Sequence, residues 1–112
     1  MNNEYVMILC IINNGFSEIA MNAAKMCGAR GGTVIHGRGT ASKEAEKFFN
    51  ISIQPEKEIV MILVKEEIKS AILQGLYSAV GTSTPAQGIA FALPVDEVIG
   101  IDNNQNLKEK SH

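Results

Sequence analysis

The sequence predicts an α+β domain of the ferredoxin-like class, in which two helices cover one face of a four-stranded antiparallel sheet. Three observations support this class. Four apolar runs and two segments of helical periodicity follow one another in the order β-α-β-β-α-β, which is the order of that sandwich. Polar, glycine-containing segments separate them. The length of 112 residues suits one domain with one core.

Four apolar runs are predicted to be strands, at residues 5–12, 31–35, 59–64 and 89–93. The first and third runs are apolar at consecutive positions, so they offer apolar side chains to both faces of the sheet. Such a sheet is normally covered on both faces. Because two helices cover only one face, the second face is predicted to meet another subunit, since it would otherwise be a large exposed apolar patch.

Two segments have helical periodicity, at residues 16–27 and 68–79. Ser17 or Asn14 is expected to cap the first helix, and Gly28 is placed to end it. Glu66 and Glu67 precede the second helix, where carboxylates favour the positive end of its dipole. Both helices are therefore predicted with defined ends.

The remaining segments complete a single domain at residues 1–102. Residues 38–50 are polar and are predicted to form a loop or a helical turn, while residues 95–101 are expected to form a short extension of the last strand. Residues 103–112 are polar and are predicted to be a frayed C-terminal tail.

Composition excludes several classes of protein. A net charge of −2 and a pI near 5.6 argue against nucleic-acid binding, which normally requires a basic face. No apolar run approaches the length of a membrane span, so no membrane insertion is expected. The N-terminus lacks the basic segment of a signal peptide, which predicts a cytoplasmic location. Cys10 and Cys27 are expected to be free thiols, and without a CxxC pair no metal site is expected.

Two glycine-rich loops form the candidate ligand site. One of the two arginines of the chain lies between glycines in the first loop, and the second loop spans residues 81–88. Glycines allow close backbone approach and positive φ, consecutive amides form an anion nest, and arginine adds a planar fork for phosphate or carboxylate. The sequence therefore predicts an anion-binding crevice, for a nucleotide, from Gly37, Arg38, Gly39, Thr40, Gly81, Thr82, Ser83 and Gly88.

Several of these residues also have a plain structural interpretation. Gly37 and Gly39 are equally typical of a simple turn, and Gly81 of a helix C-cap. Arg38 is alternatively a solvated side chain paired with Glu44 or Glu46.

At this point the chain resembles the PII nitrogen-regulatory signalling proteins. The resemblance covers roughly residues 4–101, and it rests on the order of elements and on the segment GIAFALPVDEVIGI at residues 88–101. In addition, Gly37-Arg38-Gly39-Thr40 is similar to the start of the mobile T-loop of that family, and residues 55–60 resemble the strand that closes the loop.

The resemblance implies a homotrimer that holds a small-molecule effector in clefts between subunits. The implied ligands are ATP, ADP or AMP and, with less support, 2-oxoglutarate with magnesium; no cofactor is required. It also implies a regulator that is not an enzyme and that signals through its T-loop to a partner, such as a membrane transporter or an enzyme.

This chain departs from the family pattern in ways that identify it as a divergent member. The segment that corresponds to the T-loop is shorter than usual. Positions that are basic in the family are occupied here by Ile89, Gly100 and Asp102, which removes positive charge from the expected phosphate site. Arg38 stands at a usually hydrophobic position and is predicted to replace part of that charge.

Two hypotheses from other classes remain open. One is an acylphosphatase-like hydrolase on the same fold, in which Arg38 holds a phosphate, although no histidine–carboxylate pair is placed to act as a base. The other is an oligomeric scaffold without a ligand. Stabilisation by added nucleotide would distinguish the sensor from the scaffold.

Overall fold

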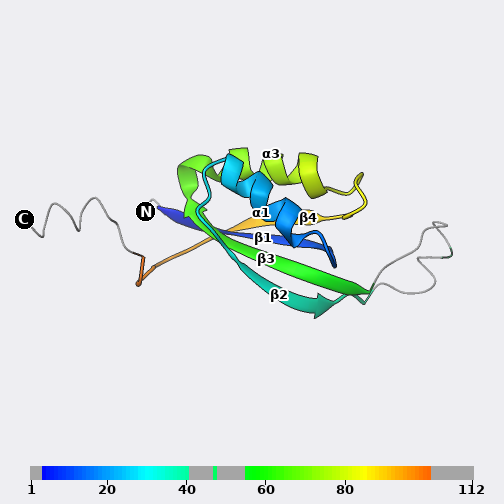
Figure 1. The fold of residues 1–112 in the computed structure, drawn as a ribbon. Coiled ribbons are helices and arrows are strands. Elements are labelled where there is room, and N and C mark those ends of the chain that lie inside the picture. The colour runs from blue at the N-terminus through cyan, green and yellow to red at the C-terminus, as the bar shows by residue number, and fades with distance from the viewer. Residues whose placement is uncertain (1–3, 41–46, 48–54, 102–112) are drawn as a thin grey trace, which may run out of the picture.

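A computed structural model describes residues 4–40, 47 and 55–101 of the chain. The elements are β1 (Tyr5–Asn13), α1 (Ser17–Met26), β2 (Thr33–Arg38), β3 (Glu56–Lys65), the 3-10 turn η1 (Glu66–Ile68), α3 (Lys69–Val80) and β4 (Ile89–Pro94). The strands form one antiparallel sheet in the order β2-β3-β1-β4. Both helices lie on the same face of this sheet (Figure 1), so the predicted ferredoxin-like class is confirmed.

The core lies between the helices and one face of the sheet. Alternate residues of β1 and β3 are buried there, which is the period of two that a strand imposes on its side chains. Ile72, Leu76 and Val80 of α3 and Ala20 and Ala24 of α1 close the core from above. The strand side of the core consists of Val6, Ile8, Cys10, Ile12, Val60, Ile62 and Val64.

The other face of the sheet is apolar as well and is not covered by the described part of the chain. Strand register places one row across all four strands, with Ile89 opposite Ile11, Ile11 opposite Ile59, and Ile59 opposite Ile35. We call this surface the open face; it consists of Ile35, Ile59, Met61, Leu63, Met7, Leu9, Ile11, Ile89, Phe91 and Leu93. The expectation that the strands are apolar on both faces is therefore confirmed.

The β2 strand begins and ends later than expected, spanning residues 33–38 rather than 31–35. Gly32 precedes the strand and lies close to β3, because a Cβ there would be 2.7 Å from the carbonyl oxygen of Met61, so only a residue without a side chain fits. Arg38 is consequently the last residue of a strand and not the first of a loop.

The structure describes only part of the segments outside the strands and helices. Residues 95–101 form no further strand, so the predicted extension is wrong. Residues 41–46 and 48–54, which include most of the predicted loop or helical turn, and the predicted tail at 103–112 lie outside the described residues. In the part of the chain that the structure describes, no helix has the length and apolar character needed to cross a membrane.

The start of α1 is capped by a residue distant in sequence. Phe16 occupies the N-cap position without a side-chain hydrogen bond, so the expected caps Ser17 and Asn14 are wrong. Instead, Glu58 Oε1 of β3 accepts hydrogen bonds from the amides of Gly15 (2.9 Å) and Ser17 (3.1 Å). At the other end, Gly28 adopts a φ of 111° directly after the C-cap, which confirms that it ends the helix.

Candidate ligand site

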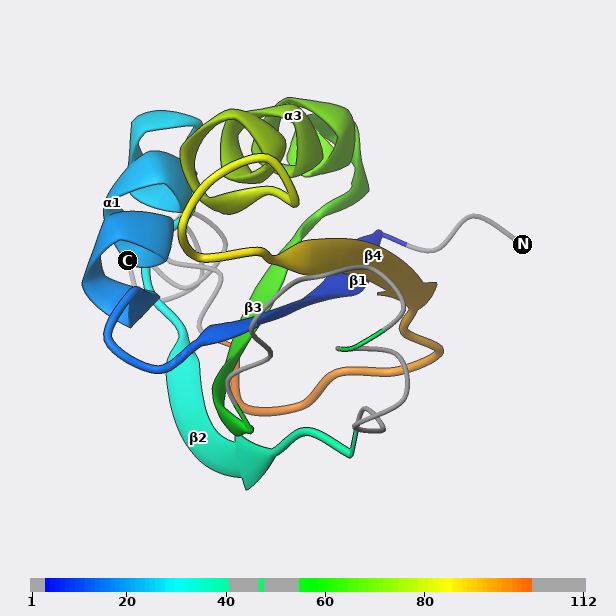
Figure 2. The ribbon, with the colours of Figure 1, turned by 90° about the vertical axis from the view of Figure 1, so that its right-hand side faces the viewer.

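The two predicted glycine loops lie at the same end of the sheet but at opposite edges. The first follows β2, and the second joins α3 to β4, while β3 and β1 lie between these two edge strands. Figure 2 shows β2 and β4 on opposite sides of the sheet. The two loops therefore form no common crevice within one protomer, and a crevice that uses both requires a second copy of the chain.

The glycines of both loops have ordinary backbone conformations. None of Gly37, Gly39, Gly81 and Gly88 adopts the positive φ that glycine allows; in the second loop Gln87 does, at 48°. Gly88 is required by packing, because a Cβ there would lie 2.6 Å from Ile12 Cγ2 and would also overlap the carbonyl oxygen of Val80.

The second loop uses most of its amides internally. Thr84 donates to the carbonyl oxygen of Gly81 through its amide (3.0 Å) and its hydroxyl (2.8 Å). The amides of Gln87 and Gly88 donate to Thr84 O and Val80 O. Gly81 and Gly88 are buried, whereas Thr82 and Ser83 are exposed at the tip. Of the four residues predicted in this loop, Thr82 and Ser83 are therefore the two that are exposed to solvent.

The first loop presents its predicted polar residues to solvent. Arg38 and Thr40 are exposed, and Arg38 lies opposite Glu56 in the register of β2 and β3. The Gly39 amide donates to the carbonyl oxygen of Pro55, which closes the end of the hairpin. Glu44 and Glu46, the alternative partners of Arg38, lie outside the described residues.

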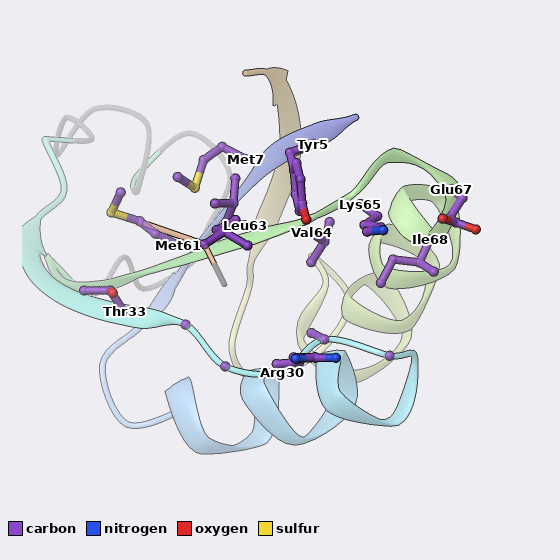
Figure 3. Close-up of a pocket in the computed structure, with 15 residues that line it drawn as sticks. Tyr5, Met7, Arg30, Thr33, Met61, Leu63, Val64, Lys65, Glu67 and Ile68 are labelled. Atoms are coloured by element: carbon purple, nitrogen blue, oxygen red, sulfur yellow. The ribbon is translucent and has the colours of Figure 1, made fainter. Parts of the chain in front are cut away.

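A larger cavity lies at the other end of the sheet, where the sequence analysis predicted no site. Pairing of β2 with β3 ends at Thr33 and Met61, so the next four residues of β3 have a free edge. The segment between α1 and β2, residues 28–32, borders the same space. Together they enclose a cavity of about 910 Å³ (Figure 3), which we call the Arg30 cavity.

The lining of the Arg30 cavity combines an apolar wall with opposite charges. Met7, Met61 and Leu63 come from the open face, so the cavity is continuous with that apolar surface. Arg30 lies on the segment after α1, whereas Lys65 and the acidic Glu67 lie at the end of β3 and in η1 (Figure 3). A ligand with an apolar or aromatic part and an anionic part fits such a lining.

The signal that could have located this cavity was present in the sequence. Arg30 is the other arginine of the chain, and it too is flanked by glycines, Gly28 on one side and Gly31-Gly32 on the other. Arg30 therefore has the same combination of a guanidinium group and flanking glycines as Arg38. The cavity itself depends on the offset between β2 and β3, which composition does not specify.

A smaller cavity of about 320 Å³ lies between α3 and β4. Gly81, Thr82 and Gly88 border it, but Leu76 and Tyr77 of α3 and Cys10 of β1 give it an apolar character. Burial raises the pKa of the Cys10 thiol to about 11, so this thiol is neutral at physiological pH. The cavity therefore supplies no charge for an anion.

The two thiols are not paired with each other. Cys10 and Cys27 are free, as expected. Within residues 4–40, 47 and 55–101, no group of three histidine, cysteine or acidic side chains is arranged to hold a metal ion.

Comparison with solved structures finds parallels for the fold. PII from Arabidopsis thaliana, in a crystal structure with citrate, has a TM-score of 0.67 and 21% identity over 89% of this chain and 82% of its own. A putative PII-like signalling protein from Thermus thermophilus has a TM-score of 0.62 and 20% identity over 81% of this chain and 85% of its own. A functionally unknown protein from Pediococcus pentosaceus has a TM-score of 0.63 and 16% identity, covering 89% of this chain and 100% of the other.

At these identities the comparison shows a shared fold, which is the fold of the PII proteins. No protein-family model matches the sequence, and no curated protein matches it either.

Proposed function

We propose that the chain is a PII-like regulatory protein that assembles as a homotrimer and binds a small anionic effector between its subunits. The observation that carries this proposal is the open face, an apolar sheet surface on a PII fold. We take the protein to be a regulator and not an enzyme, acting in the cytoplasm.

Assembly through the open face would bury residues that the isolated chain leaves in water. Ile89, Leu93 and Ile35 are 53%, 45% and 45% exposed, and Phe91 is 39% exposed. Burying such side chains is favourable in proportion to the apolar area removed from water. The trimeric state in particular is what the resemblance to the PII proteins implies.

The same assembly would complete the ligand site. The Arg30 cavity and the two glycine loops lie at opposite ends of the sheet, so they can contact one ligand only across a subunit boundary. We propose that the cavity of one subunit receives the apolar or aromatic part of the effector. Arg38 and Thr40 of a neighbouring subunit would then contact its anionic part.

Adenine nucleotides are the proposed effectors, with ATP, ADP and AMP as the first compounds to test. They combine an aromatic base, which matches the apolar wall of the cavity, with phosphates, which match Arg30 of the cavity and Arg38 of the neighbouring subunit. 2-Oxoglutarate with magnesium is the second choice. Citrate belongs in the test set because the Arabidopsis PII structure contains it.

Signalling is proposed to pass through the segment that joins β2 to β3. Its ends, Thr40 and Pro55, lie beside the first glycine loop, where a bound effector would contact it. The proposed partner is a membrane transporter or an enzyme, and the nitrogen-regulatory type is the proposed physiological context.

Calorimetric titration with each nucleotide, together with thermal denaturation, tests the ligand. We expect a nucleotide to bind and to raise the melting temperature, because it binds only the folded state. Arg30→Ala and Arg38→Ala should each weaken binding by about 1.5–3 kcal/mol, the value of a hydrogen bond to a charged group. Neither heat nor a thermal shift with any of these compounds would remove the nucleotide from the proposal.

A mixed assembly tests whether the site spans two subunits. Arg30→Ala and Arg38→Ala chains are unfolded together, refolded together and titrated. If the site combines residues of two neighbours, some clefts then regain both arginines, and a fraction of sites binds with wild-type affinity. If each site belongs to one subunit, the mixture contains no intact site and binds as weakly as the separate variants.

A further inference from the structure

A row of polar contacts crosses the sheet at the end where both glycine loops lie. Strand register places Gly37 of β2 opposite Lys57 of β3, and Lys57 opposite Asn13 of β1. Lys57 Nζ donates to Asn13 Oδ1 at 2.7 Å, and Asn13 Nδ2 donates to the carbonyl oxygen of Pro85 at 3.0 Å. The Asn13 amide donates to Ala86 O at 2.9 Å. The row therefore joins the edge that carries the first loop to the second loop.

Lys57 also contacts the backbone of the first loop. A Cβ on Gly39 would lie 3.0 Å from Lys57 Cε and 3.6 Å from its Cγ, so the aliphatic part of Lys57 packs against Gly39. Any displacement of Gly39 therefore acts directly on the side chain that holds Asn13.

Asn13 is well suited to pass such a displacement on. It is only 5% exposed, so water cannot readily replace its partners. Its bond from Lys57 is charge-assisted, and the loss of a buried partner is costly. The side-chain amide of Asn13 also donates to the carbonyl oxygen of Pro85. The backbone of Asn13 is held in place as the last residue of β1.

We propose that the Lys57–Asn13 hydrogen bond couples the two glycine loops, so that a displacement of Gly39 in the first loop alters the opening of loop 81–88. Its use in signalling rests on the proposed function, because an effector bound at one loop would then be sensed at the other. The coupling itself belongs to the ligand-free protein and needs no effector.

Amide hydrogen exchange of the ligand-free protein tests the coupling. The Gln87 amide donates to Thr84 O at 2.9 Å and the Gly88 amide to Val80 O at the end of α3 at 2.7 Å, so their exchange reports the opening of the loop. Lys57→Met keeps the aliphatic stem and removes the ammonium group. We expect it to raise exchange at Gln87 and Gly88 about tenfold, because the loop loses the anchor that holds Asn13 against Pro85.

A matched pair of glycine variants tests transmission from the first loop. Gly39→Ala places a methyl group against Lys57 Cε and should also accelerate exchange at Gly88. Gly37→Ala is the control, because its methyl group would meet only Ile59 Cδ1, at an ordinary 3.4 Å. It should leave exchange at Gly88 unchanged.

Amides of Ile8 and Ile62, in the buried centre of the sheet, report global unfolding. Faster exchange at Gly88 without a change at Ile8 and Ile62 supports the coupling. Unchanged exchange at Gly88 in Lys57→Met overturns it, and so does equal acceleration at all of these amides. Since no ligand is present, these results are independent of whether nucleotides bind.

Discussion

At the scale of single residues, the two arginines show what glycine patterns can and cannot indicate. Arg38 was singled out because glycines flank it, and it lies exposed at the end of β2. Arg30 has the same surroundings in sequence and borders the larger cavity. The pattern identifies a loop that can approach a ligand, but the cavity forms only where β3 extends beyond β2.

The glycines of the second loop illustrate a further limit. Gly81 and Gly88 were predicted to bind a ligand, yet the structure gives each a steric reason, since a Cβ on either would overlap a backbone carbonyl oxygen. These oxygens, of Tyr77 and Val80, belong to the last turn of α3. A single sequence therefore cannot separate a glycine required by packing from one that approaches a ligand.

The buried thiol of Cys10 makes a measurable contribution to the pH dependence of stability. Its pKa is about 11 in the folded protein against 9.0 for an ordinary thiol, so above pH 9 the unfolded chain releases this proton first. The contribution is fully present below pH 9 and is lost as pH rises toward 11. The free energy of unfolding should fall there by up to about 1.4 kcal/mol per pH unit from this group.

Urea denaturation at pH 8, 9, 10 and 11 measures this effect. Lysines and tyrosines also titrate in this range, so Cys10→Ala serves as the control that lacks only the thiol. The wild-type protein should lose more stability than Cys10→Ala between pH 9 and 11. Parallel pH profiles for the two proteins would show that the thiol does not ionise differently on unfolding.

At the scale of elements, the sequence predicted the type and order of every strand and both helices in the described part of the chain. Hydrophobic runs and helical spacing depend on local pattern, and that pattern agrees with the structure. The element ends were less predictable. The cap of α1 comes from Glu58, 41 residues from Ser17, so no local motif could have indicated it.

Removal of the Glu58 carboxylate should destabilise the fold through α1. Glu58→Ala leaves the amides of Gly15 and Ser17 without their acceptor and removes negative charge from the helix N-terminus. We expect a loss of about 1–3 kcal/mol, the cost of leaving partly buried donors unsatisfied. Urea denaturation followed by circular dichroism measures it.

Glu56→Ala is the matched control, because Glu56 lies on the same strand and is exposed. It should change the free energy of unfolding by less than about 0.5 kcal/mol. Equal losses in the two variants would mean that the charge of β3, and not the cap, determines stability.

At the scale of the whole molecule, the apolar strands predicted both the fold of one chain and its contact with further chains. Consecutive apolar residues in β1 and β3 indicated a sheet apolar on both faces, and the open face confirms this. The covering of that face involves other chains, so neither the sequence of one chain nor its structure specifies the number of subunits. The ligand site has the same limit, because its proposed halves lie at opposite ends of the sheet.

A charge placed on the open face should therefore separate folding from assembly. Phe91 lies opposite Leu9 on this face, midway along the edge strand β4, and contributes little to the core beneath the helices. Phe91→Asp should fold, but its carboxylate would be buried without a partner in any assembly that covers the face. We expect light scattering coupled to gel filtration to show the wild-type protein as a trimer and Phe91→Asp as a monomer with native circular dichroism.

Ile19→Asp provides the control for a generic effect of the new charge. Ile19 is 47% exposed on α1, on the opposite side of the sheet from the open face. This variant should keep the mass of the wild-type assembly. A trimer that persists in Phe91→Asp would place the subunit contacts elsewhere, and a wild-type monomer would contradict assembly through the open face altogether. Either result would also contradict a ligand site that combines the Arg30 cavity with the glycine loops, because the two can meet only across a subunit boundary formed by the open face.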